Sequence, residues 1–234
     1  MGDPFVPNTA WIPAIPAGSR VGWSQGVPAS ENLESPIWTS FDVTVGGTPL
    51  ASPTASNGTV LTNARQLFGT AALAQHFLGV AVTYTNGGFV TLRGFAKKGH
   101  ASGILDFVGL TFLNLGFIAT TIFNIDLGTV TTTPSQATAT SITALAGGWF
   151  ELAVTLATPI TGSAPIIAFG DAPINSVVPY VGDPSFGNIW DGLQVCAAST
   201  LGINPEGYVK SRGTTNDGVV GYPAIPAMNS VSAP

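Results

Sequence analysis

The sequence is poor in charged residues and in cysteine, and both deficits exclude classes of function. Asp, Glu, Lys and Arg make up 8% of the 234 residues, against roughly 25% in an ordinary globular domain. Seven basic and twelve acidic side chains give a net charge of -5. Nucleic-acid binding, which needs about six to ten cationic phosphate contacts, is therefore not expected. The one cysteine, Cys196, excludes an intrachain disulfide and an all-cysteine metal cluster.

Signals for insertion into a membrane are also missing. Prolines at positions 4, 7, 13 and 16 interrupt the apolar character of the N-terminus, which has no basic region before an apolar core, so no signal peptide is expected. The uncharged interval 107–125 approaches the roughly 20 residues that span a bilayer. Its Asn, Gly and Thr residues, with abundant Phe and Ile, favour two adjacent buried strands instead.

Turn-forming residues and period-two alternation predict an all-β protein. The 29 glycines and 18 prolines interrupt helices and favour short strands joined by turns. Apolar and polar residues alternate in 41–45 and in 150–156, where Glu151 falls on the outward face. The only expected helix is 63–76. Further strands are predicted at 78–85, 89–96, 104–113, 117–127, 164–169 and 188–195.

This order of elements predicts antiparallel sheets packed face to face, a β-sandwich of the jelly-roll type. About eight to ten strands follow one another without amphipathic helices between them, as in sandwiches and jelly rolls. Such folds often form one domain of this length. We therefore expect a single sandwich domain at 31–215, with an extended N-terminal arm at 1–30 and an extended C-terminal arm at 216–234.

The two arms are rich in proline yet carry more apolar side chains than a solvated linker does. An aromatic residue followed by two prolines three apart occurs as WIPAIPA at 11–17 and as YPAIPA at 222–227. Proline makes both segments extended. Two unrelated tails would show the same pattern; the functional interpretation is a pair of docking arms. The residues predicted to dock are Phe5, Trp11, Ile12, Ile15, Trp23, Tyr222 and Ile225.

Catalytic groups do not come together in this sequence. The segment 22–26, GWSQG, fits the G-x-S-x-G nucleophile motif, but a Pro-rich arm precedes Ser24 and Pro28 follows it. A nucleophile elbow needs a strand before the serine and a helix after it. Glu151 and Asp191 are conceivable cross-strand neighbours, but a solvated carboxylate is the default for Glu151. We therefore predict a protein that is not an enzyme and has no catalytic residue.

Metal ligands are not expected either. The two histidines are far apart in sequence, so His76 is expected in the core or at a strand edge and His100 in a loop. Asp171, Asp183 and Asp191 lie in expected loops or near strand ends, where they could offer oxygen ligands to a structural calcium ion. The D-x-D-x-D-G spacing is absent. We predict no metal site and no cofactor.

The order of several short motifs resembles one protein family. The motifs are Asn32-Leu33 with Ser35 and Trp38-Thr39, LRGFAKKG at 92–99, FNIDLGTV at 123–130, GGWFELAVT at 147–155, IWDGLQV at 189–195, and the segment 208–214. Together they are similar to the jelly-roll, carbohydrate-binding-like domains of tailed-bacteriophage virion proteins. Val195 stands where that family usually has an acidic residue.

This resemblance implies a lectin-like sandwich and a structural role in a virion. Because phages reuse this fold as a structural module, it does not by itself imply sugar binding. The leading hypothesis is a non-enzymatic capsid cement or decoration protein on the outside of the virion capsid. Its expected partners are further copies of itself, with a trimer as the natural guess, and the major capsid protein. The low charge and the apolar arms motivate this hypothesis.

An adhesin of the phage tail or fibre is the alternative hypothesis. It would bind host glycans through the loops at one end of the sandwich, using aromatic platforms beside polar groups. The candidate glycan contacts are Trp38, Tyr180, Asp183 and Trp190. Trp149 and Trp190 belong to expected strands, where a core position is the more common role. A secreted hydrolase that uses Ser24 is the third and weakest hypothesis.

Overall fold

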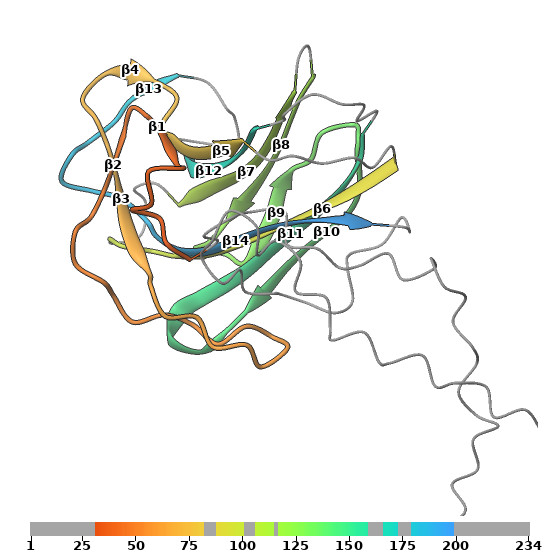
Figure 1. The fold of residues 1–234 in the computed structure, drawn as a ribbon, viewed down its shortest axis with the longest axis horizontal. Helices are drawn as coiled ribbons and strands as arrows, with labels where there is room; N and C mark the ends of the chain where they lie inside the picture. Colours follow the sequence, from red (N-terminus) through yellow and green to blue (C-terminus); the bar gives the residue numbers. More distant parts are fainter. Residues whose placement is uncertain are drawn as a thin grey trace, which may run out of the picture.

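The computed structural model describes residues 31–81, 88–100, 106–114, 117–158, 166–172 and 179–198. Within them, two six-stranded antiparallel sheets pack face to face, and a two-stranded ribbon lies at one end (Figure 1). The predicted all-β antiparallel sandwich is confirmed. The predicted docking residues of both arms lie outside the described residues, as does Ser24. The arms and the domain boundaries therefore stay predictions.

The first sheet joins strands that are distant in sequence. Its spatial order is β1 (Thr39–Phe41), β5 (Phe77–Ala81), β12 (Ile166–Ala172), β7 (Phe107–Asn114), β8 (Phe117–Asn124) and β9 (Thr129–Thr132). Strands β7 and β8 pair as neighbours along their whole length, as the uncharged interval between Asp106 and Asp126 predicts. Among the described residues, no helix is long and apolar enough to cross a membrane.

The second sheet is built around the central strands β6 and β14. Its spatial order is β10 (Ala137–Ala144), β11 (Trp149–Thr158), β6 (Gly88–Lys97), β14 (Ile189–Ala198), β3 (Arg65–Gly69) and β2 (Val43–Val45). The short 3-10 turn η2 (Ala146–Gly148) joins β10 to β11 at the predicted Gly-Gly turn. The separate ribbon pairs β4 (Leu73–Ala74) with β13 (Tyr180–Val181).

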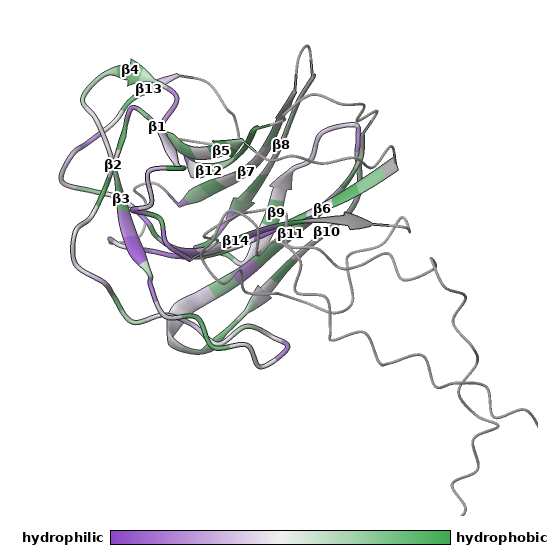
Figure 2. Cartoon of the chain, in the orientation of Figure 1, coloured by the Kyte–Doolittle hydropathy of each residue, from purple (hydrophilic) through white to green (hydrophobic). Residues whose placement is uncertain are grey.

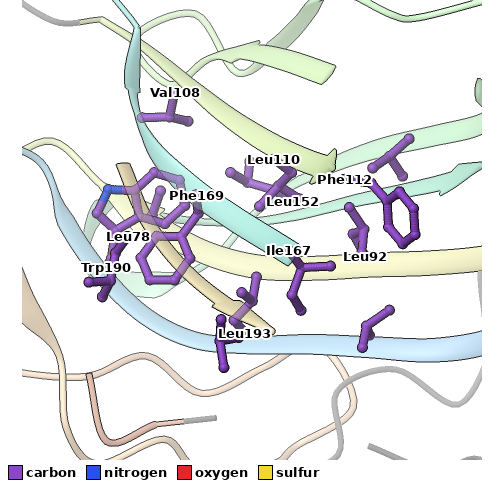
Figure 3. Packing of buried hydrophobic residues seen from close by; sticks show 14 of the residues in the cluster. Leu78, Leu92, Val108, Leu110, Phe112, Leu152, Ile167, Phe169, Trp190 and Leu193 are labelled. Atoms are coloured by element: carbon purple, nitrogen blue, oxygen red, sulfur yellow. The ribbon is translucent and has the colours of Figure 1, made fainter. Parts of the chain in front are cut away.

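Alternate residues of the facing strands form the core. Side chains on one face of a strand are two residues apart, so a period-two apolar pattern produces a continuous apolar layer. Figure 3 shows members of this layer from both sheets, with Leu110 and Ile167 on one side and Leu92 and Leu152 on the other. All four are at most 1% exposed. Dense packing at this interface therefore holds the two sheets together.

The predicted helix at 63–76 is wrong, because this segment forms strands β3 and β4. Arg65–Gly69 alternates between buried and half-buried positions and pairs with both β2 and β14. The charged start of β3 hides its apolar period, and this hydrophilic stretch stands out in Figure 2. Tertiary pairing thus overrides a weak helical propensity.

The predicted strand at 41–45 is broken at Asp42. This residue has φ of 51° and separates β1, which belongs to the first sheet, from β2, which belongs to the second. Asp and Asn tolerate the left-handed region better than most residues that have a side chain. A second irregularity is the bulge between Asp191 and Leu193 in β14, where Gly192 has φ of 47°. The bulge changes which side of β14 the following residues face.

The outward position predicted for Glu151 is correct in direction but wrong in exposure. Glu151 lies on the face of β11 away from the main core, yet it is 2% exposed. It forms an ion pair with Arg93 of β6 and accepts a hydrogen bond of 2.8 Å from the backbone N–H of Ser56. Leu61 and Trp149 pack in a second apolar cluster on this face. The segment around residues 55–61 therefore covers a surface that the sequence pattern indicated as solvated.

Removing one member of the buried ion pair should destabilise the protein more than removing both charges. Glu151→Gln leaves the guanidinium of Arg93 without its carboxylate, which costs about 3 kcal/mol or more of unfolding free energy. In Arg93→Met/Glu151→Gln no charge is left buried, and the introduced amide keeps an acceptor for Ser56. Urea unfolding should show the double variant less destabilised than Glu151→Gln alone, and therefore less destabilised than the sum of the single variants. Simple additivity would contradict this account of the pair.

Candidate functional site

The candidate site lies at the end of the sandwich where the β4–β13 ribbon meets the corner between β1 and β2 (Figure 1). The turn between β3 and β4, the end of β12, and the loop that enters β14 belong to the same end, because hydrogen bonds connect them. Loops held by a rigid scaffold are common places for binding residues. This end also contains two of the four residues that the sequence predicted as glycan contacts, Tyr180 and Asp183.

His76 ties three of these segments together. It is 3% exposed, and its ring nitrogens lie within hydrogen-bonding distance of the carbonyl oxygens of Asp42 and Tyr180. The distance from Nε2 to the Tyr180 oxygen is 3.0 Å. A neutral imidazole has one N–H and donates to one of these carbonyls, whereas the protonated ring donates to both. His76 thus has the buried position expected from the sequence and fixes where Tyr180 lies.

Tyr180 is half-buried at this end. Its ring lies edge-on to His76, with 4.5 Å between ring centroids and 66° between ring planes. Its hydroxyl donates a long hydrogen bond of 3.5 Å to the backbone oxygen of Asp171. Burial raises the pKa of Tyr180, and the nearby Asp171 carboxyl raises it further. Tyr180 is therefore a neutral phenol held in one orientation.

Asp171 anchors the loop that leads into β14. Its Oδ1 accepts a hydrogen bond of 2.9 Å from Asn188 Nδ2, and its Oδ2 accepts one of 3.2 Å from the Asn188 backbone N–H. Asp171 keeps some exposed surface as a residue, but protein surrounds its carboxyl group. This burial raises its pKa to about 6, although the hydrogen bonds from Asn188 and the charge of His100 oppose the rise.

The loop at 182–188 can approach the sheet closely because of its glycines. A Cβ on Gly187 would lie 1.5 Å from the backbone oxygen of Leu67, and a Cβ on Gly182 would lie 2.3 Å from that of Thr70. Neither position has room for a side chain. Gly187 also accepts a hydrogen bond of 2.8 Å from Gln66 Nε2 through its carbonyl. The loop is therefore packed directly on β3 and its following turn.

Two exposed aspartates belong to the segments that meet at this end. Asp42 and Asp183 are both exposed. Asp183 Oδ1 accepts a hydrogen bond of 2.7 Å from the Ser185 N–H, which forms a local turn and fixes the carboxylate. Asp42 Oδ1 lies 3.4 Å from the hydroxyl of Thr70, which donates to it. The carboxylates keep further lone pairs for donors from outside the protein.

The structure does not bring the two predicted tryptophans to this surface. Trp38 and Trp190 are 7% and 1% exposed, and both pack on Phe169 at ring-centroid distances of 5.6 Å and 4.8 Å. Figure 3 shows Phe169 and Trp190 beside one another in the core. Neither indole is open to a sugar ring, so their predicted glycan contacts are wrong for this structure. The core position expected for Trp149 and Trp190 is confirmed.

Sequence reasoning missed the roles of Asp42 and Asp171 at this end. Asp42 sits in an alternating segment that predicted one strand, and only its left-handed backbone reveals the corner. The hydrogen bonds between Asp171 and Asn188 join β12 of the first sheet to the residue that precedes β14 of the second, 17 positions along the chain. The local signal was the Asp, Asn and Gly content of the loops, which indicates turns but not which turns meet.

Glu151 and Asp191, the two carboxylates that the sequence analysis considered for catalysis, lie among buried residues of the second sheet. Glu151 and Asp191 both pair in register with Phe95, from opposite sides of β6, so one strand separates them and they are not the direct cross-strand neighbours considered from the sequence. Glu151 is occupied by Arg93. Burial raises the pKa of Asp191 to about 6, and the charge of Glu31 adds to this rise. Within the part of the chain that the structure describes, no group of three His, Cys, Asp or Glu residues is arranged to hold a metal ion.

Comparisons with known proteins concern the fold. No protein-family model matches this sequence, and no curated protein matches it. Among solved structures, the carbohydrate-binding module TmCBM27, described for mannan recognition, shares 11% identity at a TM-score of 0.41. The match covers 74% of this chain and 95% of that one.

Two xylanase structures contain similar domains. The CBM22-1–GH10 modules of xylanase 10B from Clostridium thermocellum, solved with xylohexaose, share 14% identity at a TM-score of 0.39. That match covers 76% of this chain and 29% of the other. The CBM22-1 xylan-binding domain of Xyn10C from Paenibacillus barcinonensis shares 17% identity at a TM-score of 0.36, over 75% of this chain and 99% of the other.

These likenesses concern the β-sandwich and say nothing about a ligand of this chain. The sandwich itself is shown by the strand pairing of this protein. None of the three structures is a virion protein. The resemblance to phage virion proteins, the capsid partner and the virion location therefore stay predictions from the sequence.

The buried carboxyls predict that part of the stability is lost as pH rises. The pKa of Asp171 is about 6 in the folded protein and 3.8 ordinarily, so the folded state holds this proton more tightly than the unfolded state. The contribution is complete below about pH 4, declines between pH 4 and 6, and amounts to about 3 kcal/mol at most. Asp191 acts in the same direction.

Asp171→Asn should therefore flatten the decline of unfolding free energy between pH 4 and 6, because asparagine does not titrate. Asp171→Asn/Asp191→Asn should flatten it further. Urea unfolding at pH 4, 5, 6 and 7 measures the effect. The same slope in wild type and in both variants would show that neither carboxyl causes the pH dependence.

Proposed function

We propose that this protein is a non-catalytic carbohydrate-binding protein and that the Tyr180 end of the sandwich is its binding surface. The observation that carries the proposal is the half-buried Tyr180, whose ring packs against His76 at the same end of the sandwich as the exposed residues Asp42 and Asp183. The proposal stands on these side chains and not on the similar folds, whose sequences share at most 17% identity with this chain.

The chemistry of this surface suits a sugar ring. A pyranose offers an apolar C–H face that packs on an aromatic ring, and hydroxyl groups that donate to carboxylate oxygens. Tyr180 supplies the aromatic ring, and its raised pKa keeps it neutral. Because His76 and Asp171 already hold Tyr180 in place, little side-chain freedom is lost when a ligand binds.

The charge of the surface favours neutral sugars. Asp42 and Asp183 are both acidic, and the whole chain carries a net charge of -5. An acidic sugar such as a uronic acid would bring a third carboxylate against them, which is repulsive at short range. Neutral hexose and pentose oligosaccharides are therefore the proposed ligand class.

The proposal corresponds to the adhesin hypothesis from the sequence, in which loops at one end of the sandwich bind host glycans. The cement hypothesis rests on arms that lie outside the described residues, and nothing in the described part speaks for a capsid contact. The proposal concerns binding without chemistry and assigns no nucleophile or general base to this end.

Tyr180 variants test the proposal. Tyr180→Ala should weaken binding of a neutral oligosaccharide at least about tenfold, because the aromatic platform is lost. Tyr180→Phe keeps the ring and should retain most of the affinity. A glycan array that covers neutral and acidic oligosaccharides identifies the ligand, and calorimetry measures the affinities. Ser135→Ala, at an exposed position in the loop between β9 and β10, is the control.

Carboxylate variants test the proposed selectivity separately. Asp42→Asn/Asp183→Asn should weaken neutral-sugar binding about threefold to tenfold and reduce the discrimination against uronic-acid oligosaccharides. Asparagine is chosen because it tolerates the positive φ of residue 42. The proposal fails if no neutral glycan binds to the folded protein, or if Tyr180→Ala binds as tightly as wild type.

A further inference from the structure

Strand β10 ends the second sheet with an open edge. It pairs with β11 on one side, and among the described residues no strand pairs with its other side. Strand β9, the last strand of the first sheet, reaches β10 through a short connection at 133–136. An open edge displays a row of backbone N–H and C=O groups that can accept another strand.

The length of this edge separates it from the other sheet edges. Strands β1 and β2 have three residues each and β9 has four, whereas β10 has eight. From Ala139 to Ala144 its register with β11 is regular, and its one irregularity lies between Ala137 and Ala139 at the start. Natural proteins usually protect an edge of this length with charge, proline or a bulge within it.

Strand β10 has none of these protections after its first residues. Its sequence is ATATSITA, and no charged residue occurs between Asp126 and Glu151. Threonine and isoleucine favour strands. A chain with a net charge of -5 repels its own copies wherever acidic residues meet. Two copies can therefore approach along β10 without like charges of this strand meeting.

We propose that β10 pairs antiparallel with β10 of a second copy of this chain, about a two-fold axis centred on Ser141. Such an axis stands perpendicular to the sheet, so each residue meets one on the same face. Ser141 then meets Ser141, Thr140 meets Ile142, and Ala139 meets Thr143. Ser141–Ser141 is a hydroxyl pair and Thr140–Ile142 is a β-branched pair, both of which stabilise cross-strand contacts, and no like charges face each other. The second sheets of both copies become one continuous sheet.

A lysine at the two-fold axis tests this interface. Analytical ultracentrifugation of the full chain up to about 100 µM should show a dimer. Ser141→Lys places two ammonium groups opposite each other and should weaken the dimer at least about tenfold. Leu73→Lys, at a 71% exposed position on β4, adds the same charge elsewhere and should leave the dimer intact.

A cysteine at the same position tests the register even if the lysine variant does not fold. Residues opposite each other in an antiparallel pair have Cα atoms about 4.5 to 5.5 Å apart, which a disulfide can bridge. In a Cys196→Ala background, Ser141→Cys should form a covalent dimer under mild oxidation, whereas Leu73→Cys should form no disulfide cross-link between copies. A wild-type monomer at every concentration overturns the proposal. An oligomer unaffected by Ser141→Lys, with no preferential Ser141→Cys cross-link, overturns it as well.

Discussion

The pairing of β6 with β11 on one side and β14 on the other is the constraint on which the rest of the structure depends. This register directs Leu92, Leu152 and Leu193 into the core and directs Arg93 and Glu151 to the opposite face. It also sets where β14 begins. Asn188 therefore reaches Asp171 at the end of β12, and the loop that carries Tyr180 and Asp183 is fixed by the same pairing.

The sandwich could be predicted from sequence because its signals are local. Period-two alternation located β11, and the Gly-Gly step located the turn before it. The helix predicted at 63–76 was wrong because the charged start of β3 obscures the alternation of this segment. That alternation is explained only by the pairing of β3 with β14. The solvent exposure predicted for Glu151 was wrong for a related reason. Alternation indicates which side of a strand a residue faces, but not whether a distant segment such as 55–61 covers that side.

The candidate site could be predicted only in part. Tyr180 and Asp183 were identifiable because they lie in a stretch with turn-forming residues, where aromatic and acidic side chains are available for binding, although Tyr180 itself belongs to the two-residue strand β13. Trp38 was predicted as a surface contact because an indole near a strand end gives no local sign of burial. The ring on which it packs belongs to Phe169, more than a hundred positions along the chain. His76 shows the same limit, since its partners belong to segments 34 and 104 positions away.

The central position of β14 has a consequence for how the chain folds. This strand is the last one described, yet it sits between β6 and β3 in the middle of its sheet. The β7–β8 and β10–β11 pairs close short loops and form early, whereas β6 must wait for β11 on one side and for β14, about a hundred residues later, on the other. We therefore expect slow folding, and synthesis on the ribosome must pass residue 198 before the second sheet is complete. Until then, the complete second sheet does not cover the β7–β8 and β10–β11 hairpins, and these hairpins can contact one another or other chains.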